Sequence, residues 1–134
     1  MTLGEYLSSA ARRRWDWGGQ AGDDCCTFMA GWVIARGHPD PMAFIRGRYD
    51  SERSAIRRIE DGGGLVALWR RGMGEAGLAE VRGDPRAGDV AVLDLPTEEG
   101  VNLACGIFSG ERWVTRTLNG VEAGPAVSVA AWRP

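Results

Sequence analysis

The sequence predicts an α+β fold in a single domain over residues 1–134, and three observations support that prediction. Helical periodicity is confined to the first half, about residues 1–78, whereas strand-like runs occupy the second half, about residues 80–134. When helices come first and strands follow, the strands pair antiparallel and the helices pack on their sheet. The third observation is a modest length without an internal repeat or a linker, which favours one domain.

The first two helices are predicted by their apolar spacing and their caps. Apolar side chains within residues 3–10 recur at i, i+3, i+4 and i+7, which predicts a short amphipathic helix with Thr2 as its N-cap. After a glycine-rich loop, Asp23 or Asp24 caps a second helix. We expect this helix to end at Gly37, because glycine is favoured just past a helix C-terminus.

Two further helices are predicted before the strands begin. Asp50 or Ser51 caps the third helix, which is expected to end at the glycine run that starts with Gly62. The fourth helix is expected to span 65 to about 71 and to break up from Gly72 onward, where several glycines follow.

The second half contains four predicted strands. They occupy 90–93, 101–108, 112–118 and 127–132. The third of them ends at Asn119-Gly120, which is a strong signal for a hairpin turn. These strands are expected to form a small antiparallel sheet on which the helices pack.

Composition excludes several classes of partner. The formal net charge of −2 gives no electrostatic reason to bind nucleic acid or an anionic membrane surface. All sixteen basic residues are arginine, which indicates either recognition of phosphate or carboxylate groups or, more simply, a bias in the coding DNA. No apolar run approaches the ~18 residues of a membrane span, and the N-terminal residues lack the apolar segment of a signal peptide.

Three cysteines do not form a secreted disulfide framework here. Cys25 and Cys26 are adjacent and Cys105 leaves the number odd, which indicates a reducing compartment during assembly. With one histidine and no Cys-x-x-Cys spacing, the sequence predicts no metal site, and no motif indicates a cofactor.

Cys25 is placed where a thiol can be activated. It follows the predicted N-cap Asp24, and the unpaired N–H groups of a helix N-terminus favour the thiolate. Cys26 lies about 100° further round the helix, so we expect it to face away from the same cleft and to join the core. The alternative for Cys25 is an inert buried thiol, since free cysteines are among the most buried residues.

The segments Trp17-Gly18-Gly19 and Asp24-Cys25-Cys26-Thr27-Phe28 form a pattern seen elsewhere. Together they resemble the signature of the NlpC-like cell-wall peptidases, a papain-like superfamily. The resemblance implies a papain-like fold with N-terminal helices on a small antiparallel sheet or half-barrel. It also implies that Cys25 is the nucleophile, that Trp17 lies at the cleft rim, and that Gly18 and Gly19 let the backbone approach a peptidoglycan stem peptide.

Of two downstream segments, the first extends the resemblance and the second departs from it. Ala87-Gly88-Asp89-Val90 is similar to the Pro-Gly-Asp segment that opens a strand in the family. The family then carries a general-base histidine, and the corresponding position here is Ala104, which cannot accept a proton. Because a general base contributes ~10²–10⁴-fold, this degenerate position predicts a loss of catalysis.

The remaining candidates for a base are poor ones. His38 lies beyond the far end of the helix that begins near Cys25, roughly 20 Å away at 1.5 Å per residue. Asp94, Glu98 and Glu99 follow or end the first strand, but a carboxylate beside a thiol would raise the thiol pKa. Asn102 cannot take a proton.

Cys105 is adjacent to the empty base position. Because neighbouring residues on a strand face opposite ways, Cys105 is expected to point away from Cys25 if Ala104 points toward it. A disulfide between Cys25 and Cys105 would then need a shift in register.

Further segments bring the resemblance closer to small proteins of phage, prophage and gene-transfer-agent tail modules. They are Gly47-Arg48-Tyr49, the glycine run over 62–65, and Ala131-Trp132-Arg133. The resemblance implies a virion tail protein made in the host bacterial cytoplasm, with tail-tip or hub proteins as partners and peptidoglycan as a candidate ligand. Two hypotheses follow. One is a catalytically degenerate structural or binding component, and the other is an active cysteine peptidase or amidase that cuts stem peptides during cell-wall penetration.

Overall fold

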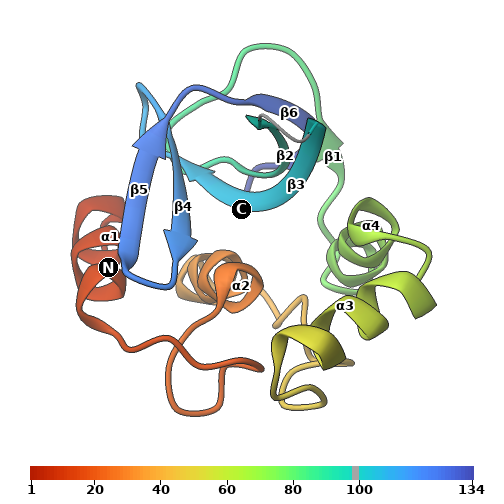
Figure 1. Cartoon of the computed structure of the whole chain (residues 1–134). Coiled ribbons are helices and arrows are strands. Elements are labelled where there is room, and N and C mark those ends of the chain that lie inside the picture. The colour runs from red at the N-terminus through yellow and green to blue at the C-terminus, as the bar shows by residue number, and fades with distance from the viewer. Residues whose placement is uncertain (98–99) are drawn as a thin grey trace.

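The computed structural model describes residues 1–97 and 100–134 and has an α+β architecture (Figure 1). Its described residues form four helices followed by six strands: α1 (Leu3–Arg12), α2 (Cys25–Ala35), α3 (Glu52–Asp61), α4 (Leu65–Glu75), β1 (Glu80–Val81), β2 (Val90–Thr97), β3 (Gly100–Phe108), β4 (Trp113–Thr117), β5 (Gly120–Gly124) and β6 (Val127–Trp132). The predicted order of helices before strands is confirmed. None of the described helices is long and apolar enough to cross a bilayer.

The strands form one sheet in the order β1-β6-β2-β3-β4-β5, and each pair of neighbours is antiparallel. β2 and β3 pair along their whole length, whereas β3 meets β4 only at Ile107 and Phe108. The sheet curves over α2, with α1 beside β5 and with α3 and α4 on the opposite side (Figure 1).

The main core lies between the sheet and α2. Alternate residues of β2 and β3, such as Val92 and Ile107, are fully buried against helix residues that include Phe28 and Met29. The helix α2 is apolar on every side because it is enclosed by other elements. A second, smaller cluster around Leu93 covers the other face of the sheet.

The predicted helix starts are confirmed. Thr2, Asp24 and Ser51 are the N-caps of α1, α2 and α3, and the side chains of all three accept backbone N–H groups. At Asp24 and Ser51 the residue three positions on returns a hydrogen bond, which completes a capping box.

The predicted end of the fourth helix is wrong. α4 continues through Gly72 to Glu75 rather than breaking up. Gly72 is buried, and a Cβ there would lie 2.0 Å from the carbonyl oxygen of Pro41. This glycine therefore permits a close approach of two backbones and does not terminate the helix.

The strand prediction omitted two elements and shortened a third. β1 is only two residues long, and β5 follows the Asn119-Gly120 turn and pairs with β4. β2 continues to Thr97, although the sequence predicted a strand over 90–93 only. β4 and β6 match their predicted ranges closely.

Candidate functional site

The carboxylate of Asp24 is the structural centre of the candidate site. One oxygen accepts the N–H groups of Cys26 and Thr27 at 2.9 and 2.8 Å. The other accepts the N–H of Gly18 at 3.0 Å and the hydroxyl of Tyr49. Asp24 is 1% exposed, so these four donors replace the water that a buried carboxylate loses.

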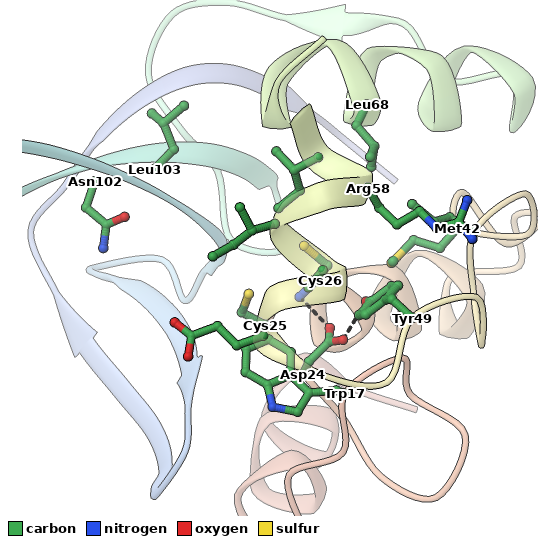
Figure 2. A pocket seen from close by; sticks show the side chains of 15 residues that line it. Trp17, Asp24, Cys25, Cys26, Met42, Tyr49, Arg58, Leu68, Asn102 and Leu103 are labelled. Carbon is green, nitrogen blue, oxygen red and sulfur yellow. Dashed lines mark hydrogen bonds between the residues drawn. The ribbon is translucent and has the colours of Figure 1, made fainter. Parts of the chain in front are cut away.

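Cys25 is the first residue of α2 and opens onto a pocket of about 300 Å³ (Figure 2). Its side chain is partly exposed, whereas Cys26 beside it is buried. The pocket walls are mainly apolar and come from the loop before α2, from the segment between α2 and α3, from α3 and α4, and from β3. Their residues include Trp17, Met42, Ile45, Ala55, Ile56, Ile59, Leu68 and Leu103. Trp17, which is predicted to lie at a cleft rim, is one of these lining residues.

Two of the three cysteines, Cys26 and Cys105, are in contact beside this pocket. The sulfur atoms of Cys26 and Cys105 are 3.4 Å apart, and Cys105 is fully buried on the face of β3 that covers α2. The expectation that Cys105 points away from Cys25 is therefore wrong. Cys26 is a core residue as predicted, but it also lines the pocket beside Cys25, contrary to the expectation for a residue 100° round the helix (Figure 2).

The three thiols differ in acidity because they share hydrogen bonds. The pKa of Cys25 is lowered well below its usual value, mainly by hydrogen bonds from Cys105 and Cys26 and less by backbone N–H groups at the helix start. Burial opposes this effect but does not cancel it. The same contacts raise the pKa of Cys26, and burial first of all raises the pKa of Cys105. Cys25 is therefore the thiol that ionises first.

Ala104 does not face Cys25, which corrects its assignment as the base position. It pairs with Leu93, whose side chain belongs to the small cluster on the opposite face of the sheet. A Cβ at the next residue but one, Gly106, would also meet Leu93, at 2.5 Å. The strand residues on the side of Cys25 are Leu103 and Cys105.

The other bases considered from the sequence do not line the pocket of Cys25. His38 lies three residues beyond the end of α2, and Asp94 lies on β2 outside the pocket lining. Asn102 does line the pocket, but an amide cannot take a proton. Glu98 and Glu99 lie outside the described residues.

Glu52 is a pocket residue that the sequence did not reveal. It is the first residue of α3 and an exposed carboxylate at the same pocket as Cys25. The signal was available in part, because the capping box at Ser51 fixes where α3 starts and so which residues form its first turn. Nothing in the sequence showed that this turn would face Cys25.

A family model described as a domain of unknown function, DUF6950, matches residues 1–134. The chain belongs to the DUF6950 family. Neither the curated proteins nor the solved structures contain a match to it. Within residues 1–97 and 100–134, no three His, Cys, Asp or Glu side chains are arranged so that they could hold a metal ion.

Gly18 and Gly19 of this DUF6950 chain serve its own packing. Their φ angles are 91° and 73°, values that favour glycine. A Cβ at Gly18 would lie 2.3 Å from the carbonyl oxygen of Tyr49, and one at Gly19 would lie 2.5 Å from the methyl of Thr27. These glycines let the loop close over Asp24, so they shape the site without needing a ligand beside them.

The Gly88-Asp89 motif of the DUF6950 chain lies at the other end of α2. The carbonyl of Gly88 accepts the indole N–H of Trp32 at 2.9 Å. The buried carboxylate of Asp89 pairs with Arg133 through two hydrogen bonds of 2.8 and 2.9 Å and also accepts the N–H of Arg86. Trp32 is seven residues from Cys25 along the helix, about 10 Å away. The motif therefore ties the far part of α2 to the start of the sheet and is not part of the pocket.

Proposed function

We propose that this DUF6950 chain is a component of a phage-type tail tip or hub, with an NlpC-type papain-like fold whose Cys25 pocket binds a ligand without hydrolysing it. The observation that carries the loss of hydrolysis is the composition of the wall opposite Cys25. Asn102 and Leu103 are the β3 residues that line the pocket, and neither side chain can serve as the imidazole-like base that a cysteine peptidase needs.

The tail assignment is supported by the resemblance in three segments. The arginine of Gly47-Arg48-Tyr49 and the tyrosine beside it both have structural roles: Arg48 accepts a hydrogen bond from Arg58 through its carbonyl, and Tyr49 donates to Asp24. The segment Ala131-Trp132-Arg133 is equally integrated, since Trp132 is buried and Arg133 pairs with Asp89. The partners in this proposal are other tail-tip or hub proteins, and the location is the virion tail.

The pocket suits a peptide-like ligand with a charged end. Its walls are apolar, and the exposed guanidinium of Arg58 lies on its rim where it can pair with a carboxylate. Peptidoglycan stem peptides combine short apolar side chains with free carboxylates, so they are the ligand class that we propose.

The test measures binding and cleavage in the same samples. The purified chain is incubated with peptidoglycan fragments, binding is followed by calorimetry, and cleavage is followed as new amino termini. We expect the wild type to bind the fragments without cleaving them. Cys25→Ala should bind them equally well. Ile56→Arg, which places a charge on the exposed apolar wall, should weaken binding, whereas Val127→Arg on the exposed part of β6 should not. Turnover that disappears in Cys25→Ala would refute the non-hydrolytic proposal.

The lowered pKa of Cys25 favours a second candidate, an active cysteine peptidase or amidase that cuts stem peptides. In that case Glu52, the exposed carboxylate of the pocket, would be the group to take a proton. Cleavage that is lost in both Cys25→Ala and Glu52→Gln, and retained in His38→Ala, would establish this candidate. Cleavage retained in Glu52→Gln would show that Glu52 is not the group that takes the proton.

A further inference from the structure

Two buried thiols from the two halves of the chain lie in contact, and neither proposed function uses this contact. The sulfur atoms of Cys26 and Cys105 are 3.4 Å apart, although the two residues are separated by 79 positions in the sequence. Cys26 belongs to the first turn of α2, and Cys105 lies on β3, which packs on this helix. Both cysteines are free. The contact therefore joins the helical half of the molecule to the strand half.

The geometry of this thiol pair is close to that of a disulfide. An S–S bond is ~2.0 Å long, so the two sulfur atoms need to approach each other by only ~1.4 Å. They come from two elements that are already packed together, so small adjustments of the side chains bring them within bonding distance. A bridge between the neighbours Cys25 and Cys26 would instead have to distort the first turn of α2.

The two thiols of the pair differ in their access to solvent. Cys26 is 8% exposed and lines the pocket, whereas Cys105 is 0% exposed and lies outside the pocket lining. A small reagent in the pocket therefore reaches the pair at Cys26. This difference sets the order in which the two thiols react.

We propose that Cys26 and Cys105 form a disulfide by exchange with a low-molecular-weight disulfide that enters the pocket, and that this bridge fastens α2 to β3. The proposal goes beyond the tail and peptidoglycan-binding role, and it does not depend on that role. In a reducing compartment the two thiols stay separate, and in an oxidising one the bridge forms. The pair thereby couples the stability of the fold to the redox state of its surroundings.

The exchange balances in two steps. The thiolate of Cys26 attacks one sulfur of the small disulfide, the S–S bond of that molecule breaks, and one small thiolate leaves and takes up the proton that Cys26 lost. The sulfur of Cys105 then attacks the sulfur of Cys26, the mixed S–S bond breaks, and the second small thiolate leaves with the proton of Cys105. Two electrons pass from the protein thiols to the small disulfide, which becomes two thiols. Cys25 takes no part in these steps.

The experiment uses the full chain, first reduced and then incubated with oxidised glutathione. It is run at about pH 8.5, because hydrogen bonds to Cys105 and Cys25 and then burial raise the pKa of Cys26, and the thiolate is the attacking form. Remaining thiols are blocked with iodoacetamide, and the chain is digested with trypsin without reduction. Cleavage after arginine leaves Cys25 and Cys26 in one peptide, 15–36, and Cys105 in another, 87–112. We expect these two peptides to be linked.

Matched variants of the two neighbouring cysteines identify the partner of Cys105. The linked peptides should persist in Cys25→Ala and disappear in Cys26→Ala. The wild type and Cys25→Ala, which replaces the partly exposed thiol, decide the matter even where the buried substitution unfolds the chain. Two results would overturn the proposal: a wild type in which no linked peptides form, or a link that is lost in Cys25→Ala.

Thermal unfolding tests whether the bridge fastens the fold. A bridge between residues 79 positions apart restricts the unfolded chain, so oxidised Cys25→Ala should melt about 10 °C above its reduced form. Dithiothreitol should remove the difference. The double variant Cys25→Ala with Cys105→Ala, treated in the same way, should melt at one temperature throughout. An unchanged or lowered midpoint in the bridged chain would show that the bridge does not fasten α2 to β3.

Discussion

A buried aspartate lies beside a motif glycine at each end of helix α2, but different groups balance the charge of the two aspartates. At the start of the helix, Asp24 is held by four uncharged donors beside the open pocket of Cys25. Near the other end, Trp32 bonds to Gly88, and Asp89 next to it pairs with the guanidinium of Arg133.

This difference separates an end that opens onto a pocket from an end that is held by an ion pair. An arginine beside Asp24 would add a positive charge next to Cys25 and tie the carboxylate to a flexible side chain. Uncharged donors instead hold the carboxylate rigidly in the helix cap, so that the thiol acidity is set by the helix start and the other two thiols. At Asp89 the ion pair fastens the C-terminal residues to the start of β2. The sequence motifs are alike, but only the first end holds a thiol beside the pocket.

The largest expected effect comes from Asp24→Ala. It leaves the hydroxyl of Tyr49 and three backbone N–H groups without their acceptor, and such groups cost about 1–3 kcal/mol each when buried. Allowing for water that enters the gap, we expect the free energy of unfolding to fall by about 4 kcal/mol. Chemical denaturation measures the loss. Asp24→Asn, which keeps one acceptor oxygen, should lose clearly less; equal losses would contradict the capping role.

Asp89→Ala should have the second-largest effect, about half that of Asp24→Ala. The partner Arg133 is partly exposed and can return to water, so only the N–H of Arg86 loses a buried acceptor. Thermal unfolding should show the smaller loss, and the iodoacetamide reaction rate of Cys25 should be unchanged. A changed rate would show that the two ends of α2 are coupled and would break the comparison.

The sequence allowed the helix caps to be predicted because each cap depends on residues within one turn. Asp24 and Ser51 were recognisable from their type, because aspartate and serine are favoured N-cap residues. The order of helices and strands was also predictable from local periodicity. These features need no knowledge of distant contacts.

The orientation of β3 was predicted wrongly because the family resemblance points Ala104 toward Cys25, whereas the pattern of residue sizes along the strand indicates the opposite face. Leu103, Cys105 and Ile107 are the apolar alternate set, and they face the pocket and the core. Ala104 and Gly106 are small because Leu93 packs on that face. Alternation of large and small residues would have predicted this face correctly. The meeting of Cys105 with Cys26 could not be predicted, since it depends on how α2 crosses the sheet.

Tyr49→Phe should have a smaller effect on stability, about 1.5 kcal/mol. It removes one of the four donors to Asp24 and leaves the backbone donors in place. The carboxylate then keeps more of its negative charge unshared near Cys25, so the pKa of that thiol should rise slightly. Iodoacetamide rates measured against pH should show a midpoint shifted upward from that of the wild type. A downward shift would mean that Tyr49 does not act on Cys25 through Asp24.

The smallest effect and the most specific one is the pH dependence of stability in Cys25→Ala. The pKa of Cys25 is lower in the folded chain than the ~8.5 of an unfolded thiol, so folding favours its thiolate. The stability that this adds is complete above the unfolded pKa and is lost as the pH falls through the lower folded pKa. The unfolding free energy of the wild type relative to Cys25→Ala should therefore rise with pH between these two values and then level off.

Cys26→Ala is the matched control with the opposite sign, because the raised folded pKa of Cys26 makes the wild type lose relative stability as the pH rises above ~8.5. Denaturation curves at a series of pH values test both signs, and equal slopes in the two variants would show that the thiols are not differentiated by their positions at the start of α2.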